Sequence, residues 1–155
     1  MTHIYNRRYC SEYMQKINDK EHLEYAVISF DLNNLKVMND TYGHAKGDIL
    51  IKSAARVIAD TFEKHGVVGR MGGDEFIAIL PTIQNEEIEK LLEEFYVNIQ
   101  KKNQKENDLN LSISYGCARS CELEEKDVEK LYQLADSRMY EHKKAYKKQS
   151  KSERG

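Results

Sequence analysis

The chain contains no tryptophan, only one proline and only three cysteines among its 155 residues. A single proline and eight glycines exclude a collagen-like or proline-rich repeat. The cysteines, Cys10, Cys117 and Cys121, are odd in number and lack the paired spacing of a zinc site. We interpret them as small apolar residues of a protein in a reducing compartment.

Neither sign of charge dominates, because 24 Lys and Arg residues face 26 Asp and Glu residues and give a formal net charge of -2. This balance indicates no general affinity for polyanions, so we expect no nucleic-acid binding. No apolar run reaches the roughly 18–20 residues that span a bilayer, and residues 1–18 are too polar for a signal peptide. We therefore predict a cytoplasmic domain without membrane contact of its own, in a full-length protein that can still carry a membrane anchor.

Hydrophobic periodicity predicts alternating helices and strands. Helices are expected at 7–18, around 35–40, at 47–62, from Asn85 and from Asp127, strands at 25–32 and 109–117, and a hairpin at 67–80. Asn85 is expected to cap the helix that it begins, and Gly43 is expected to end the short helix around 35–40. A hairpin in the middle of alternating helices and strands argues for one α/β (α+β) domain, a mixed sheet with helices packed on it.

The most informative segment is Gly72-Gly73-Asp74-Glu75-Phe76, a tight turn followed by two carboxylates at the start of an apolar strand. A further carboxylate, Asp31, lies at the end of the strand at 25–32. Acidic groups at the ends of two strands are a common way to hold Mg²⁺, which prefers hard oxygen ligands. Because side chains alternate along a strand, we expect only one of Asp74 and Glu75 to share a metal with Asp31.

Two other features suit a phosphate-bearing substrate. Lys143 and Lys147 are four residues apart, so a helix places them on one face. The backbone amides around Asn34 and Leu35, at the start of the short helix, can cradle phosphates.

These segments resemble the motifs of the GGDEF diguanylate cyclase family. Residues 72–76 match its signature, residues 31–48 resemble its other long motif, and residues 6–8 and 135–140 are also similar, so the resemblance covers essentially the whole chain. It implies one catalytic domain at residues 1–150, a tail at 151–155, and a central five-stranded mixed sheet flanked by helices, as in nucleotide cyclases and polymerase palm domains. Because Met1 stands close to the first motif, we expect this domain to belong to a longer protein with a sensory or dimerisation segment.

The resemblance also implies an activity. Two GTP molecules would be condensed into cyclic di-GMP and two pyrophosphates at a homodimer interface, with Mg²⁺ or alternatively Mn²⁺. One site cannot do this alone, because the product is made from two substrates held in opposite orientation.

By resemblance, the metal is held by Asp31, the backbone carbonyl of Leu32, and Asp74. Catalysis is assigned to Asp74, Glu75 and Lys36. The substrate is contacted by Asn34, Leu35, Asn39, Asp48, Lys143 and Lys147. A carboxylate such as Asp48 accepts the N1 and N2 donors of guanine, for which adenine has no equivalent pair, so ATP should be rejected.

Several of these residues keep a second interpretation. Glu75 either helps to deprotonate the attacking 3′-hydroxyl or is a structural, solvated acid. Asp48 can also cap its helix, or lie in the first turn, where a carboxylate is favoured by the helix dipole. Lys143 and Lys147 belong to a lysine-rich segment, and such segments are usually only solvated. Arg70 is expected to support the hairpin or an interface and not to be catalytic.

The chain departs from the family pattern at three site positions. Asn33 stands where a second Asp is usual, Leu35 where Phe is more common, and Lys147 where Arg is more common. Lysine keeps the charge but loses the bidentate fork, so affinity for triphosphate is expected to fall. Since Asp31 and Asp74 remain, we expect activity to survive.

A fourth departure concerns regulation. Many family members carry Arg-x-x-Asp five residues before the Gly-Gly pair, where it binds product and inhibits the enzyme. This chain has Glu63-Lys64-His65-Gly66 there, so we predict no product inhibition through that site.

Two other functions fit the sequence less well. A catalytically weak or inactive GGDEF domain that binds nucleotide and signals through a partner is disfavoured, because all five signature residues are present. A different nucleotide cyclase or a polymerase-like palm is disfavoured by Asn39 and Asp48 together with the signature.

Overall fold

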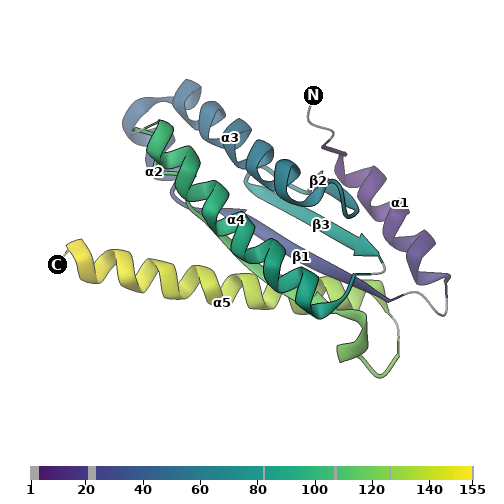
Figure 1. Ribbon diagram of the computed structural model, residues 1–155. Helices are drawn as coiled ribbons and strands as arrows, with labels where there is room; N and C mark the ends of the chain where they lie inside the picture. The colour runs from purple at the N-terminus through teal and green to yellow at the C-terminus, as the bar shows by residue number, and fades with distance from the viewer. Residues whose placement is uncertain (1–3, 21–23, 82, 107, 126, 155) are drawn as a thin grey trace.

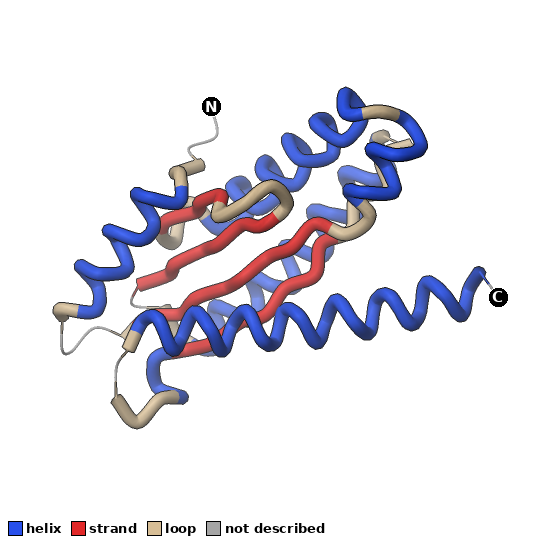
Figure 2. Tube along the Cα trace, turned by 180° about the vertical axis from the view of Figure 1, so that it is seen from behind, coloured by secondary structure: helices blue, strands red, loops and turns tan. Residues whose placement is uncertain are grey.

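The computed structural model describes residues 4–20, 24–81, 83–106, 108–125 and 127–154, which form three layers (Figure 1). The middle layer is a sheet of β1 (Tyr25–Leu32), β2 (Val67–Arg70), β3 (Glu75–Pro81) and β4 (Ile113–Arg119). Helices α3 (His44–Phe62) and α4 (Asn85–Lys105) cover one face. Helices α1 (Arg7–Asn18) and α5 (Val128–Arg154) cover the other, as Figure 2 shows from behind. The short α2 (Leu35–Tyr42) and the 3₁₀ helix η1 (Ser120–Glu122) complete the fold.

The strand order is β2-β3-β1-β4, and every strand pair is antiparallel. The expected α+β architecture is confirmed, but the prediction of a five-stranded mixed sheet is wrong for the described residues. The parallel pairing recorded there is one isolated bridge, in which Tyr5 N donates to Val68 O and Arg70 N donates to Tyr5 O, both at 2.9 Å. The chain cannot extend this bridge into a strand, because Asn6 already caps α1 by accepting from Tyr9 N.

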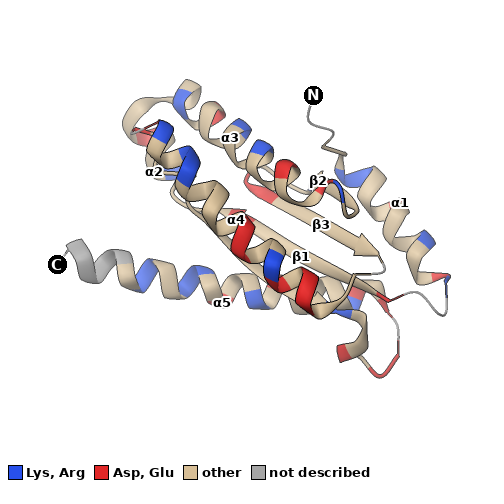
Figure 3. Ribbon diagram, in the orientation of Figure 1, with Lys and Arg blue, Asp and Glu red and all other residues tan. Residues whose placement is uncertain are grey.

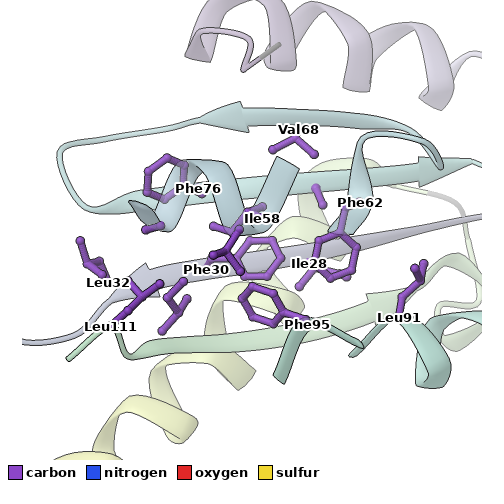
Figure 4. Close-up of a cluster of buried hydrophobic side chains, with 14 of the residues drawn as sticks. Ile28, Phe30, Leu32, Ile58, Phe62, Val68, Phe76, Leu91, Phe95 and Leu111 are labelled. Carbon is purple, nitrogen blue, oxygen red and sulfur yellow. The ribbon is translucent and has the colours of Figure 1, made fainter. Parts of the chain in front are cut away.

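The core packs mainly between the sheet and the α3–α4 layer. Rings of Phe30, Phe62 and Phe95 lie 5.3 to 5.5 Å apart at its centre (Figure 4). All eight residues of β1 are buried, and its even-numbered residues face this core. Side chains alternate along a strand, so the odd-numbered residues, Asp31 among them, face the α1–α5 layer.

Most predicted elements agree with the structure. The helix at 7–18 and the strand at 25–32 have the expected bounds, and Gly43, at φ +89°, ends α2. Asp127 starts α5, since its Oδ1 accepts from the backbone N–H groups of Glu129 and Lys130. Helix α5 then continues to Arg154, so the backbone of residues 151–154, expected as a tail, is helical.

Three boundaries differ. Helix α3 begins at His44, three residues before the predicted start, and the N-cap of α4 is Gln84 without a side-chain cap, not Asn85. The last strand covers Ile113–Arg119 and not 109–117. Asn110 has a positive φ of 50°, and the backbone of Leu111 is bound by the side chain of Asn103, so this stretch does not pair with β1.

No helix in the described ranges combines the length and the hydropathy that a bilayer-spanning segment needs.

Candidate active site

The two predicted carboxylate positions meet at one end of the sheet. In the β1–β3 register Asp31 lies directly opposite Glu75, and Leu32 N donates to the carbonyl of Asp74 at 2.9 Å. Residues opposite each other in an antiparallel pair share a face, so Glu75 lies on the same face as Asp31. Because β3 begins at Glu75, Asp74 belongs to the turn, where strand alternation does not fix its side chain. The sequence pattern had not shown that Glu75 is the cross-strand neighbour.

Asp31 is the most perturbed carboxyl group of the site. It is 8% exposed; its Oδ2 accepts from Lys143 Nζ at 2.7 Å, and its buried Oδ1 has no hydrogen-bond partner. The pKa of Asp31 is raised to about 6, mainly by burial; the hydrogen bond and charge of Lys143 oppose this rise, and the charges of Asp74 and Glu75 contribute to it. The three acids therefore concentrate negative charge that one lysine only partly neutralises.

The donor set fits a hard divalent cation. An orphaned carboxylate oxygen beside two further acids is the chemistry that Mg²⁺ or Mn²⁺ accepts. Within the described residues, however, no three His, Cys, Asp or Glu side chains converge closely enough to hold an ion as they stand. The ammonium of Lys143 supplies the neutralising charge at Asp31 in this state.

The turn from β1 into α2 places the predicted phosphate contacts beside these acids. Asn34 adopts the left-handed conformation, at φ 66° and ψ 13°, and α2 starts at the next residue, Leu35. The first-turn N–H groups of a helix have no partner within it, so they are available to an anion. Lys36 is exposed on this turn.

Tyr146 is a site residue that the sequence did not indicate. It lies one helical turn after Lys143 on α5, and its hydroxyl accepts a hydrogen bond from Asn34 Nδ2. Lys147 is exposed beside it, without an ion pair in the described part of the chain. The signal available in the sequence was the helical spacing from Lys143, which places Tyr146 on the same side of α5.

Asn39 and Asp48, the predicted base contacts, come from α2 and α3. Oδ1 of Asn39 is buried without a hydrogen-bond partner, and Asp48 is exposed. A Cβ atom on Gly47 would overlap Oδ1 of Asn39, so glycine leaves room for the amide of Asn39 in this orientation. A buried acceptor without a donor is suited to a ligand that carries one.

Asn33, the departure from a second Asp, is 2% exposed and bound within the sheet layer. Its Nδ2 donates to Ser112 Oγ and its Oδ1 accepts from Ser114 Oγ, both at 3.0 Å. The amide therefore joins the start of the α2 turn to β4.

Arg70 supports the hairpin, as expected. Its Nε donates to Gly72 O at 3.0 Å and its Nη2 to Gly73 O at 2.7 Å. These bonds fix the backbone that leads into Asp74.

The segment at 63–66 cannot take the family's aspartate on this backbone. A Cβ atom on Gly66 would overlap the carbonyl oxygen of Ile79. Loss of the Arg-x-x-Asp pattern is thus built into the packing of the loop before β2.

Comparisons with known proteins identify the family of the chain. The family model described as "Diguanylate cyclase, GGDEF domain" matches residues 1–149. The uncharacterized protein YtrP of Bacillus subtilis is 31% identical over 149 residues, which are 95% of this chain and 24% of YtrP. The probable diguanylate cyclase DgcT of Escherichia coli is 28% identical over 148 residues, which are 92% of this chain and 32% of DgcT. The chain therefore spans a third or less of the length of these relatives.

Among solved structures, the GGDEF domain of DgcB from Caulobacter crescentus, in complex with c-di-GMP, superposes with a TM-score of 0.78 at 25% identity. The match covers 93% of this chain and 88% of that one. A second DgcB structure, which contains a coiled coil and the GGDEF domain, has a TM-score of 0.80 at 24% identity, over 93% of this chain and 78% of that one.

Proposed function

The chain belongs to the GGDEF domain family, and from this premise we propose that its site condenses two GTP molecules into cyclic di-GMP and two pyrophosphates. One observation carries the proposal: the β1–β3 register brings the positions of Asp31, Asp74 and Glu75 to one end of the sheet, from which the chain leads into the N-terminus of α2. Acids for a metal and amides for phosphates thus lie together.

Substrate binding divides between two parts of the site. Asn39 and Asp48 bind the base, where the unpartnered Oδ1 of Asn39 accepts one of the N–H donors of guanine. The amides at the start of α2, with Lys36, Lys143 and Lys147, bind the triphosphate. Lys143 must exchange its contact with Asp31 for the phosphate oxygens, because one ammonium cannot fully neutralise both.

Asp31, Asp74 and the carbonyl of Leu32 would hold Mg²⁺ or Mn²⁺, which when bound supplies the positive charge that stabilises the developing charge on the phosphates. The other contributions come from the chain. Phosphoryl transfer depends mostly on positioning and neutralisation. Arg70 holds the backbone turn that leads into Asp74, and Tyr146 holds the side chain of Asn34.

The reaction balances over two sites. The 3′-oxygen of each GTP forms a bond to the α-phosphorus of the other, and the bond from that phosphorus to the pyrophosphate oxygen breaks. Glu75, which lies opposite Asp31 on the same sheet face, would take the proton of the hydroxyl. Each site holds one GTP, so the reaction requires a homodimer, which a dimerising segment elsewhere in the full-length protein would assemble.

The test is product formation by the purified domain with GTP and Mg²⁺ at high protein concentration, with Asp74→Ala as the matched inactive control. We expect cyclic di-GMP whose rate rises steeply with protein concentration and disappears in the variant. If product forms only after fusion to a dimerising coil, the site is competent and lacks its assembly signal. No product even from the fused dimer would contradict the proposal and favour a nucleotide-binding signalling module.

A further inference from the structure

A cationic hollow lies between α3 and α4, in the helical layer on the other side of the sheet from Asp31. Its volume is about 280 Å³, and its basic lining residues are Arg56, Lys101, Lys102 and Lys105. Arg56 comes from α3 and the three lysines come from the last turns of α4, so charges from two helices meet at the hollow. Figure 3 shows basic residues on both helices.

Most of this charge is unpaired. In the described part of the chain Lys102 contacts Glu106 at 3.5 Å, whereas Arg56, Lys101 and Lys105 have no ion pair or side-chain hydrogen bond. The whole chain has a formal net charge of -2, so this accumulation of positive charge is local. Like charges gathered in a concave site repel one another and raise the local concentration of anions.

Packing between the two helices fixes the wall of the hollow. Asn98, which lines it, donates from Nδ2 to Thr61 Oγ1 at 3.0 Å, and Thr61 Oγ1 donates to the carbonyl of Val57 at 2.8 Å. Both Val57 and Thr61 are buried, so the spacing of α3 and α4 is set beside the hollow before any ligand enters. A preformed site spends less binding free energy on ordering.

We propose that this hollow binds a small phosphorylated molecule from solution, at a site separate from the one that carries Asp31. The guanidinium of Arg56 can grip two phosphate oxygens at once, and the lysines add point charges from the facing helix. Asp60, one turn after Arg56 on α3, is the one acid lining the hollow, and it opposes any anion that enters. A volume near 300 Å³ suits a small molecule.

The test follows backbone amide NMR signals of the domain while inorganic pyrophosphate is added without divalent cations. We expect the largest shifts around Arg56–Asp60 on α3 and Asn98–Lys105 on α4. The double variant Lys101→Gln/Lys105→Gln should weaken binding about tenfold or more, the loss of two charge-assisted contacts. The matched control is Lys90→Gln/Lys130→Gln, which removes the same charge from exposed helical positions outside the hollow and should leave the affinity unchanged.

A third variant tests whether removing a negative charge from the hollow raises its affinity for pyrophosphate. Asp60→Asn removes the opposing carboxylate and should tighten binding of pyrophosphate several-fold. Shifts confined to the residues around Lys36 and Lys147 would overturn the proposal, because only the first site would then bind. Equal losses in the hollow variant and the control would also overturn it, since they would indicate unspecific attraction.

A sedimentation experiment with lipid vesicles distinguishes a soluble ligand from a lipid headgroup. A site for a soluble molecule predicts that the domain does not sediment with vesicles of phosphatidic acid and phosphatidylcholine. Sedimentation that depends on Lys101 and Lys105, without shifts from pyrophosphate, would overturn the assignment to a small molecule.

Discussion

The ammonium of Lys143 lies 2.7 Å from Oδ2 of Asp31, a residue 112 positions earlier in the chain, and the two side chains are only 18% and 12% exposed. Helix α5 is therefore fastened to the end of β1 by a charge pair within the candidate site. The other oxygen of Asp31 has no partner, so the carboxylate depends on this lysine. Stability and function are coupled at this contact.

Replacing Lys143 should destabilise the domain. Lys143→Met leaves the buried carboxylate of Asp31 without its donor, and the free energy of unfolding should fall by roughly 1–3 kcal/mol, the cost of an unsatisfied buried group. Urea unfolding without divalent cations measures this. The matched control is Lys147→Met on the same helix, which is exposed and should change stability by less than about 0.5 kcal/mol.

The same change in an Asp31→Asn background isolates the contact. With a neutral residue at position 31, Lys143→Met should cost much less, because the charge to be compensated is gone. An equal cost in both backgrounds would mean that Lys143 acts through packing and not through Asp31.

Restoring the family's residue at position 33 should also destabilise this chain. Asn33 is 2% exposed and uses both halves of its amide, donating to Ser112 and accepting from Ser114. Asn33→Asp buries a charge close to Asp31, so we expect a loss of about 1–3 kcal/mol in the free energy of unfolding at neutral pH. Thermal unfolding of both proteins decides this, and an unchanged midpoint would show that the position already tolerates a carboxylate.

The Gly47→Ala substitution should change GTP affinity and the stability of the fold in opposite directions. The added Cβ overlaps Oδ1 of Asn39, the end of a side chain that can turn away, so α3 should gain up to about 1 kcal/mol in helix propensity. Asn39 would then be displaced from the base, and we expect GTP affinity to fall about tenfold, the value of one hydrogen bond to a buried acceptor. Nucleotide titration and thermal unfolding measure the two effects.

The control for this prediction is Gly73→Ala, where an added Cβ meets no atom within 4 Å. It should change neither the packing of Asn39 nor the base contact. A Gly47→Ala protein with unchanged affinity for GTP would contradict the role of Asn39 in base binding.

How much the sequence could predict differs between the fold and the site. The sequence pattern located α1 and β1 to the residue, and Gly43 correctly marked the end of α2. It misplaced β4, because Leu109 and Leu111 are buried by contacts outside the sheet that alternation cannot distinguish from strand pairing.

In the site, too, local motifs were predictable from the sequence and long-range contacts were not. The motifs located the acids at Asp31, Asp74 and Glu75, whereas the register that sets Glu75 opposite Asp31 is a long-range property of the sheet. The contacts of Lys143 with Asp31 and of Tyr146 with Asn34 depend on where α5 crosses the end of β1. No spacing within one helix contains that information.

An ion pair beside β4, an edge strand of the described sheet, should make the stability of the domain depend on pH in acid. Glu122 accepts two hydrogen bonds from Arg138, at 2.7 and 3.0 Å, and one from Arg119 N at 2.8 Å, while Arg138 also donates to the carbonyl of Cys117. These side chains satisfy backbone groups of the edge strand, which protects it from pairing with another chain.

The hydrogen bond from Arg138 lowers the pKa of Glu122 from its ordinary value of 4.5, and burial acts in the opposite direction. A carboxyl group whose pKa is lower in the folded state stabilises the fold above its unfolded pKa. This contribution is lost as the pH falls through the folded value, so the loss lies below pH 4.5. Since the pair is partly exposed, its contribution at neutral pH should not exceed about 1 kcal/mol.

Glu122→Gln should therefore be less stable than the parent at pH 7 and should lose less stability on acidification, so that the two proteins converge in acid. Urea unfolding at a series of pH values measures both differences. The control is Glu124→Gln, an exposed carboxylate of the next loop with no ion pair among the described residues. Parallel stability curves for the parent and Glu122→Gln would show that the contact with Arg138 does not survive in solution.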